Sequence, residues 1–388
     1  MAILRPEITD LELSGITRIA LEGFDIPAVV PLWFGESDLE TPDFVCQAAK
    51  DALDGGKTKY GFARGHQPLR ASLKIYLDGL YKTDIDPDRI TVPGSTMLSV
   101  FMSFMALLEK GDDIIMISPF WPNALDAVKM IGATMTDVRL EERDGRWHLD
   151  LEKIKNAIGP RTKAIYVNTP SNPTGWVMTT EEQKSLLTLA RERGLGIVSD
   201  EVYHRNLYDG SAVAPSFLEI AKEDDAVFVV NGFSKAWAMT DWRLGWVITP
   251  SGLADQMAVY SECMNTGATA FIQYGGIAAL EQGEGFLADF NSRCKQNREL
   301  VMEIIGKHPR VHLLEPQGAF YAFPKIEMKG TGLDLARGIL RSEHVGVAAG
   351  YTFGPENDDH IRLCYAISPE RLEPALKKIA SYLDRNDI

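Results

Sequence analysis

Polar and aromatic side chains follow five short runs of strand-forming residues, each at the point where the run ends. They comprise a pair of hydroxyls, a tryptophan, an asparagine, an aspartate with a tyrosine, and a serine with a lysine: Ser95 and Thr96, Trp121, Asn172, Asp200 and Tyr203, Ser234 and Lys235. In an open parallel sheet the carboxyl ends of the strands meet at one edge, where ligands bind. The pattern therefore predicts one site that holds an anion acceptor, an aromatic face, an amide, a carboxylate, a phenol and an amine.

Each of these residues has a simpler interpretation when it is considered alone. A Gly-Ser-Thr run before a helix is most often a cap, a tryptophan near a strand end is most often part of the core, and a lone lysine is usually a solvated charge. Asn172-Pro173-Thr174-Gly175 would also serve as a turn, and Asp200 as another cap. Because the residues follow five separate strands, one shared ligand explains them better than five coincidences.

The set meets the requirements of pyridoxal 5′-phosphate (PLP). Its phosphate binds N–H groups at a helix start, hydroxyls and an arginine, and its ring packs on an aromatic face. A carboxylate keeps the pyridine nitrogen protonated, and a lysine bonds to the aldehyde. The sequence therefore predicts a PLP site and no metal site: Pro309, between His308 and His312, argues against a helical pair of ligands.

Residues 234–245, with the sequence SKAWAMTDWRLG, resemble the lysine motif of the class I and II aminotransferases. These are PLP enzymes of fold type I, and the resemblance is to their aspartate aminotransferase-like members. Residues 172–175 and the segment Asp200-Glu201-Val202-Tyr203 match that family in order and spacing, as do Gly35, Tyr60 and Arg362. The resemblance covers nearly the whole chain.

The resemblance implies a distinct role for each cofactor-binding residue. Lys235 holds PLP as a Schiff base and carries the proton, while Asp200 pairs with the protonated pyridine nitrogen. Tyr203 and Asn172 bond the 3′-oxygen of the ring, on which Trp121 stacks. The phosphate-binding residues are Gly94, Ser95, Thr96, Ser234 and Arg243. Many relatives place a further phosphate-binding serine where this chain has Gly232.

The resemblance also implies how substrate and partner subunit are engaged. Arg362 clamps the substrate α-carboxylate through a bidentate pair, and Gly35, Trp121 and Asn172 contribute to substrate binding. Tyr60 resembles the tyrosine that reaches the phosphate of the neighbouring subunit, which implies a homodimer. Arg64 either lies near the substrate entrance or is a surface or interface arginine.

The implied reaction moves an amino group from an L-amino acid to a 2-oxo acid by a ping-pong mechanism. Two alternatives remain: a carbon–sulfur β-lyase on the same fold, and a PLP-binding sensor without turnover. The catalytic set Lys235, Asp200 and Tyr203 is complete, which favours an enzyme. Aspartate, aromatic and branched amino acids all remain possible donors.

Short β-branched runs alternate with amphipathic stretches between about residues 90 and 250, a pattern typical of an α/β fold with a mostly parallel sheet flanked by helices. We predict strands over 89–92, 113–118, 163–168, 195–199, 226–231 and 244–249, and helices over 96–109, 123–131, 180–193 and 286–307. The large PLP-binding domain is predicted at 46–284. Residues 1–45 and 285–388 are predicted to form an N-terminal arm and a smaller α/β C-terminal domain.

The composition excludes several classes of partner. A formal net charge of −14 repels nucleic acid and anionic membranes, so a small molecule is the expected ligand. The four cysteines are scattered, without CxxC spacing, and are expected to be reduced thiols. The acidic N-terminus does not resemble a signal peptide, and no apolar run approaches the ~20 residues that span a bilayer. We therefore expect a cytoplasmic protein.

Overall fold

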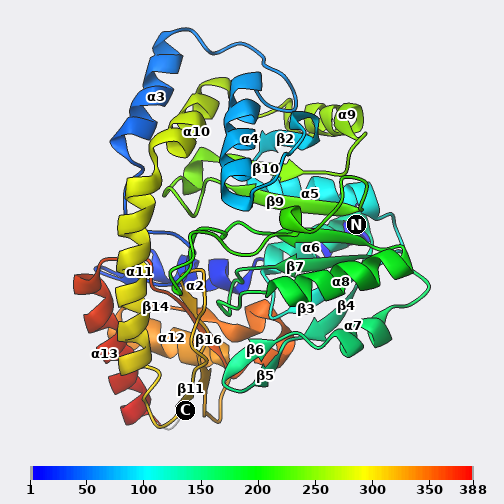
Figure 1. Cartoon of the computed structure of the whole chain (residues 1–388). Helices are drawn as coiled ribbons and strands as arrows, with labels where there is room; N and C mark the ends of the chain where they lie inside the picture. The colour runs from blue at the N-terminus through cyan, green and yellow to red at the C-terminus, as the bar shows by residue number, and fades with distance from the viewer. Residues whose placement is uncertain (1–2, 387–388) are drawn as a thin grey trace.

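The computed structural model describes residues 3–386, and its centre is a seven-stranded sheet (Figure 1). In spatial order the strands are β2 (Ile90–Gly94), β10 (Gly245–Ile248), β9 (Val227–Gly232), β8 (Gly196–Asp200), β7 (Thr162–Asn168), β3 (Asp113–Ser118) and β4 (Thr134–Arg139). Four of the six neighbouring pairs are parallel, and β10 is antiparallel to both β9 and β2. The predicted α/β class with a mostly parallel sheet is confirmed. The strand predicted over 244–249 is β10, and its antiparallel direction was not predicted.

The predicted elements agree with the observed ones to within about three residues. The strand at 113–118 and the helix at 180–193 have the predicted bounds, while the long helix α11 spans Glu284–Ile304 and not 286–307. Strand β4 was missed because its residues are mostly exposed or half-buried at the sheet edge, which leaves little hydrophobic signal. The hairpin of β5 (Glu141–Arg143) and β6 (Arg146–His148) was missed as well.

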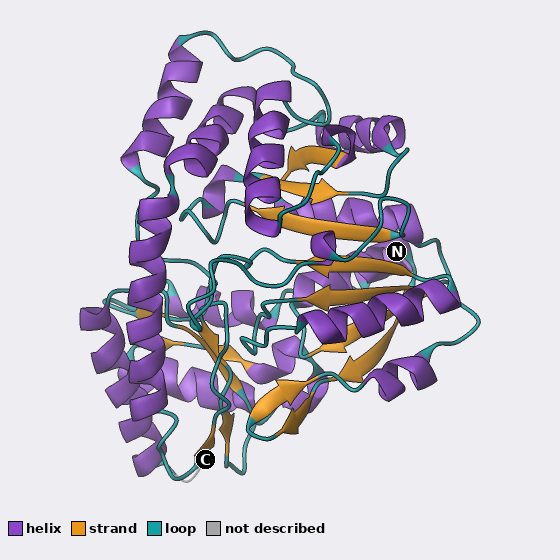
Figure 2. Cartoon of the chain, in the orientation of Figure 1, coloured by secondary structure: helices purple, strands orange, loops and turns teal. Residues whose placement is uncertain are grey.

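Helices cover both faces of the sheet (Figure 2). Because successive side chains of a strand point to opposite faces, Ile115 and Ile117 join one apolar core, and Ile114 and Met116 join another. The first core contains side chains of α4 (Gln67–Tyr81) and α8 (Thr180–Arg193), and the second those of α5 (Thr96–Leu107) and α6 (Pro122–Ile131). The sheet is therefore buried on both sides, as a parallel sheet requires.

Local sequence fixes the ends of these helices. Helix α8 starts with a capping box, in which the Thr179 hydroxyl accepts from Glu182 N–H and the Glu182 carboxylate accepts from Thr179 N–H. It stops at Gly194, whose φ of 65° is left-handed and suits glycine. Helix α5 starts with the Ser95 hydroxyl accepting from Leu98 N–H. Both starts follow directly from the residues at these positions.

A third apolar core joins the two ends of the chain. The parallel pair of β1 (Val30–Pro31) and β14 (Val345–Gly346) ties the N-terminal segment to the C-terminal part. Figure 1 shows α11 running the length of one side, from the helices around the sheet down to α13 (Pro369–Arg385). The domain limits 46–284, 1–45 and 285–388 stay a prediction.

The other helices and strands lie around the main sheet and in the N- and C-terminal parts. They are α1 (Pro6–Thr9), α2 (Gly15–Gly23), α3 (Asp43–Asp54), α7 (Leu151–Ala157), α9 (Ala254–Asn265), α10 (Ala270–Gln282), β11 (Val311–His312), β12 (Tyr321–Ala322), β13 (Lys325–Ile326), α12 (Gly332–Glu343), β15 (Ala348–Ala349) and β16 (Ile361–Cys364). Among residues 3–386, no helix combines the length and apolarity needed to cross a membrane. The cytoplasmic location stays a prediction.

Candidate active site

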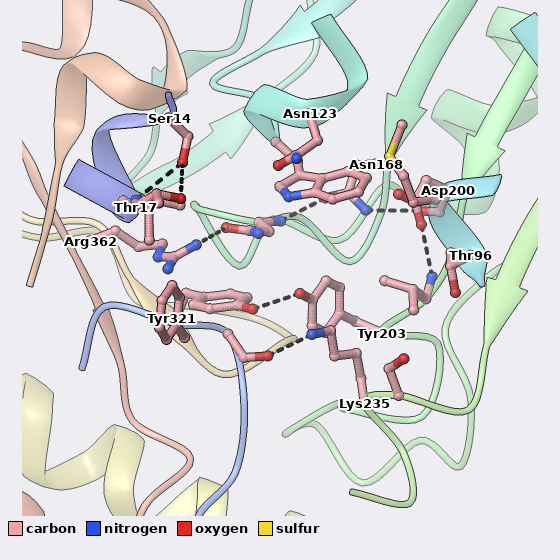
Figure 3. A pocket seen from close by; sticks show the side chains of 18 of the residues that line it. Ser14, Thr17, Thr96, Asn123, Asn168, Asp200, Tyr203, Lys235, Tyr321 and Arg362 are labelled. Carbon is pink, nitrogen blue, oxygen red and sulfur yellow. Dashed lines mark hydrogen bonds between the residues drawn. The ribbon is translucent and has the colours of Figure 1, made fainter. Parts of the chain in front are cut away.

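A cavity of about 270 Å³ opens at the carboxyl ends of the parallel strands, between the sheet and the C-terminal part (Figure 3). Its lining comes from nine separate segments of the chain. The lining residues are Ser14, Ile16, Thr17, Phe34, Gly35, Thr96, Met97, Trp121, Asn123, Asn168, Asn172, Asp200, Val202, Tyr203, Ser234, Lys235, Arg243, Tyr321 and Arg362. The strand-end pattern in the sequence thus corresponds to one shared cavity.

Most of the residues selected from the sequence meet in this cavity, and four do not. Gly94 and Ser95 lie just outside the lining, and the Ser95 hydroxyl caps α5. The side chain of Tyr60 is 93% exposed on the single chain. Arg64 donates to the backbone oxygen and a carboxylate oxygen of Asp88, at 2.7 and 3.0 Å, and does not line the cavity.

Lys235 lies in the turn after β9, with its amine buried in the cavity. Its Nζ donates to the carbonyl oxygen of Gly35 at 2.6 Å. Burial disfavours the charged ammonium and lowers the pKa of Lys235 to about 8, and the positive charge of Arg362 contributes in the same direction. A substantial fraction of the amine is therefore neutral at neutral to mildly alkaline pH, and a neutral amine is nucleophilic.

Asp200 is the last residue of β8, and its carboxylate faces the cavity. One carboxylate oxygen accepts from Val202 N–H at 3.3 Å and the other from the Tyr166 hydroxyl at 3.1 Å. Asn168 holds the Asp200 backbone through a 2.9 Å bond from its amide. Burial raises the pKa of Asp200 to about 6, so the group is mainly ionised at neutral pH. Within the described chain it has no ion-pair partner.

Arg362 lies on β16 at the other side of the cavity from Asp200 (Figure 3). Its guanidinium lies between the rings of Tyr321 and Phe353, with 4.6 and 4.9 Å from Cζ to the ring centroids. It donates to Asn172 Oδ1 at 3.0 Å and to the Trp33 carbonyl. Its Nε is buried and lacks a partner among the described residues. Contact with both rings and the bond to Asn172 restrain the guanidinium, whose fork suits bidentate binding of a carboxylate.

Tyr203 and Tyr321 face each other, and their hydroxyl oxygens lie 2.6 Å apart. Burial raises the pKa of both phenols well above the ordinary value, so both stay protonated. Tyr321 was not selected from the sequence because it lies in the two-residue strand β12 of the C-terminal part and does not follow a strand of the main sheet. Asn168 ends a predicted strand and Asn123 follows Trp121, so the strand-end rule could have found both.

The start of α5 lies at one end of the cavity and has the groups that could bind an anion. Thr96 and Met97 are its first residues, and the N–H groups of a helix start have no partners within the helix. Ser234 and Arg243 line the same cavity. A Cβ atom at Gly232 would lie 2.1 Å from Thr96 Oγ1, so a serine there would displace this threonine. This close approach favours glycine at position 232.

Comparison with known proteins shows which family the chain belongs to. The sequence profile described as "Aminotransferase class I and II" matches residues 27–379. The chain belongs to this family. The family assignment made from the lysine motif is confirmed, and the protein is an aminotransferase. This family typically uses PLP.

Relatives of this aminotransferase cover its whole length. It is 33% identical to a probable aspartate/prephenate aminotransferase of Aquifex aeolicus, over 98% of this chain and 97% of the relative. It is 32% identical to an aspartate aminotransferase of Thermotoga maritima, over 92% of each chain. The solved aspartate aminotransferase of Thermus thermophilus with maleate superposes with a TM-score of 0.91 at 30% identity, covering 98% of this chain and 100% of that one.

The side chains of the cavity fit the cofactor of the family. A buried amine, a buried carboxylate without an ion pair, an aromatic face and a helix start with an arginine and hydroxyls are the groups that PLP requires. Within residues 3–386, no group of three or more His, Cys, Asp or Glu side chains is close enough together to hold a metal ion. His308 and His312 instead contact separate carboxylates, Asp384 and Glu142.

Proposed function

We propose that the aminotransferase holds PLP in this cavity, with Lys235 bonded to the aldehyde and Asp200 facing the pyridine nitrogen. One observation carries the proposal: a buried amine with a lowered pKa and a buried carboxylate without an ion pair face the same cavity. Lys235 attracts the Asp200 carboxylate without an ion pair, and a protonated pyridine N–H would give it a directly bonded positive partner. Burying an unpaired charge is otherwise costly.

The remaining cofactor contacts follow from the cavity lining. Thr96, Ser234 and Arg243 bind the phosphate, together with N–H groups at the start of α5. Gly94 and Ser95 directly precede Thr96 in the chain, and we propose that they also contribute to phosphate binding. Trp121 covers the ring, while Asn172 and Tyr203 bond its 3′-oxygen. Tyr203 is suited to this role because its phenol stays protonated and can donate.

The chain's own residues then bind the substrate and move its proton. Arg362 binds the α-carboxylate, and Asn172 holds the guanidinium in place. Gly35 lines the proposed substrate site. Glycine is needed there because a side chain at this position would collide with Tyr321. Once the substrate amine has replaced Lys235 on the cofactor aldehyde, the freed Lys235 Nζ would accept the proton from the substrate Cα, and a pKa of about 8 suits a general base at neutral pH. PLP supplies the electron sink that makes this Cα–H bond breakable.

The proposed reaction moves the amino group of an L-amino acid to a 2-oxo acid by alternating half-reactions. Curated relatives are named for aspartate, prephenate and aromatic amino acids. We propose aspartate and aromatic amino acids as donors, with a 2-oxo acid as acceptor. The test is a panel of donors, including branched ones, with 2-oxoglutarate and with pyruvate.

The donor panel also separates the two alternative functions. A β-lyase releases pyruvate and ammonia from cystathionine or cysteine without an oxo-acid acceptor. A sensor binds PLP and turns over no donor. The proposal predicts product only when both donor and acceptor are present. Release of ammonia without an acceptor, or no turnover with any donor, would contradict it.

We also propose a homodimer in which Tyr60 reaches the phosphate site of the neighbouring subunit. Its support is the exposure of two large aromatic residues of one loop, Tyr60 and Phe62, which are 93% and 72% exposed on the single chain. Complementation tests this proposal. A mixture of Lys235→Ala and Tyr60→Ala subunits forms hybrid dimers in which one site has both native residues, so activity should reappear. No recovery after subunit exchange would contradict the shared site.

A further inference from the structure

Tyr166 lies directly behind the carboxylate of Asp200, outside the cavity. It is on β7, two residues before Asn168, and Asn168 pairs in register with Asp200 of β8. Residues two apart on a strand share a face, so Tyr166 and Asn168 point to the same side. The Tyr166 side chain is fully buried, and its hydroxyl donates to Asp200 Oδ2 at 3.1 Å. The ring packs edge-on against Phe104 of α5, with 5.5 Å between centroids.

Few other groups act on this carboxylate. Lys235 attracts it from the turn after β9, and the neutral phenol of Tyr203 faces it from the loop after β8. Helix α5, which packs over this face of the sheet, contains no ionisable residue from Thr96 to Leu107. Glu201 bonds to the Ser199 hydroxyl at 2.9 Å and to Phe217 N–H at 3.3 Å. Tyr166 and Val202 N–H are therefore the direct donors to Asp200 within the described chain.

We propose that Tyr166 is a positioning residue for transamination: its hydroxyl holds the Asp200 carboxylate toward the cavity and stabilises its charged form. The proposal rests on the proposed PLP function, in which that charge keeps the pyridine nitrogen protonated. Burial raises the pKa of Tyr166 well above the ordinary phenol value, so the hydroxyl stays a donor. A hydrogen bond to an ionised form favours ionisation, and here it opposes the effect of burial on Asp200.

The variant Tyr166→Phe removes the hydroxyl and keeps the ring that packs on Phe104. Tyr81→Phe is the matched control, because Tyr81 is also buried and its hydroxyl has no partner among the described residues. Loss of packing or of a neutral group lowers stability by the same amount at every pH. Loss of support for a carboxylate acts only where that carboxylate is ionised.

The first readout is the thermal stability of the full-length apo-protein as a function of pH. Asp200 has a folded pKa of about 6, above its ordinary value of 3.8, so its burial lowers stability as pH rises through that window. Tyr166→Phe raises the folded pKa further. Its melting-temperature deficit should therefore be larger near about pH 8 than near about pH 5. Any change in melting temperature caused by Tyr81→Phe should not depend on pH. A pH-independent deficit for Tyr166→Phe would overturn the proposal.

The second readout is the holoenzyme. Tyr166→Phe should retain PLP and lower kcat by about tenfold or more, with the acid limb of the kcat profile moved to higher pH and KM little changed. In an Asp200→Asn background, Tyr166→Phe should have little further effect, because the charge it supports is gone. Equal effects in both backgrounds would reject the proposal. A wild-type protein that fails to bind PLP would reject the proposed function, while the apo-protein measurement would still decide the role of Tyr166.

Discussion

The amine of Lys235 donates a 2.6 Å hydrogen bond to the carbonyl oxygen of Gly35, a residue 200 positions earlier in the chain. The N-terminal segment therefore forms one wall of the cavity in which the amine is buried. Gly35 also packs against Tyr321, because a Cβ atom at position 35 would lie 1.9 Å from its hydroxyl oxygen. One glycine thus contacts both the lysine of the main sheet and a tyrosine of the C-terminal part.

Lys235→Ala should abolish turnover and leave the protein folded, because it removes the amine that bonds to PLP and carries the substrate proton. Borohydride reduction followed by peptide mass spectrometry locates that bond directly. The control is Lys153→Ala, since Lys153 is a half-exposed lysine paired with Glu141 at the surface. Reduced cofactor on any lysine other than Lys235 would show that the central assignment is wrong.

Gly35→Ala should lower kcat/KM by about tenfold or more, because displacing Tyr321 disturbs its contacts with Tyr203 and Arg362. Gly79→Ala is the control: Gly79 is exposed on α4, and a Cβ there meets nothing within 4 Å. That change should leave kinetics unchanged and stabilise the helix by up to about 1 kcal/mol. Unchanged kinetics in Gly35→Ala would mean that Tyr321 can move without cost.

Asp200→Asn should retain PLP but lose most of its rate, because a neutral amide cannot keep the pyridine nitrogen protonated. The apo-protein gives an independent test. The folded pKa of Asp200, about 6, lies above its ordinary value of 3.8, so wild-type stability falls as pH rises through this window. The asparagine variant should show a smaller fall, because Asp200 no longer contributes while Glu201, whose pKa burial raises to about 7, still does. Near-normal turnover would assign the role of Asp200 to another group.

Arg362→Lys should lower kcat/KM at least about tenfold for every donor, because lysine keeps the charge but loses the bidentate geometry, and a charged hydrogen bond is worth roughly 1.5–3 kcal/mol. The absorbance of the bound cofactor should not change. The measurement is kcat/KM for three donors with different side chains. A loss confined to dicarboxylic donors would make Arg362 a residue for the substrate side chain and leave the α-carboxylate without its proposed partner.

Sequence reasoning worked best where chemistry and local structure coincide. Strand β3 and helix α8 have the predicted bounds because β-branched runs and a Thr179–Glu182 capping box are local signals. Thr96, Asn172, Asp200 and Lys235 were found because each follows a strand, and the carboxyl ends of parallel strands meet. The antiparallel direction of β10 was not predicted, because a short apolar strand reads the same in either direction.

The sequence by itself determined the family, the α/β class and the residues that contact each other through the main sheet, because these depend on motifs and on the order of strands along the chain. Only the tertiary structure decided which distant segments close the cavity. Ser14, Thr17 and Tyr321 come from the N-terminal helix and the C-terminal part, and Tyr166 reaches Asp200 from a neighbouring strand. These contacts depend on how three apolar cores pack together, and no local pattern of residue types records that packing.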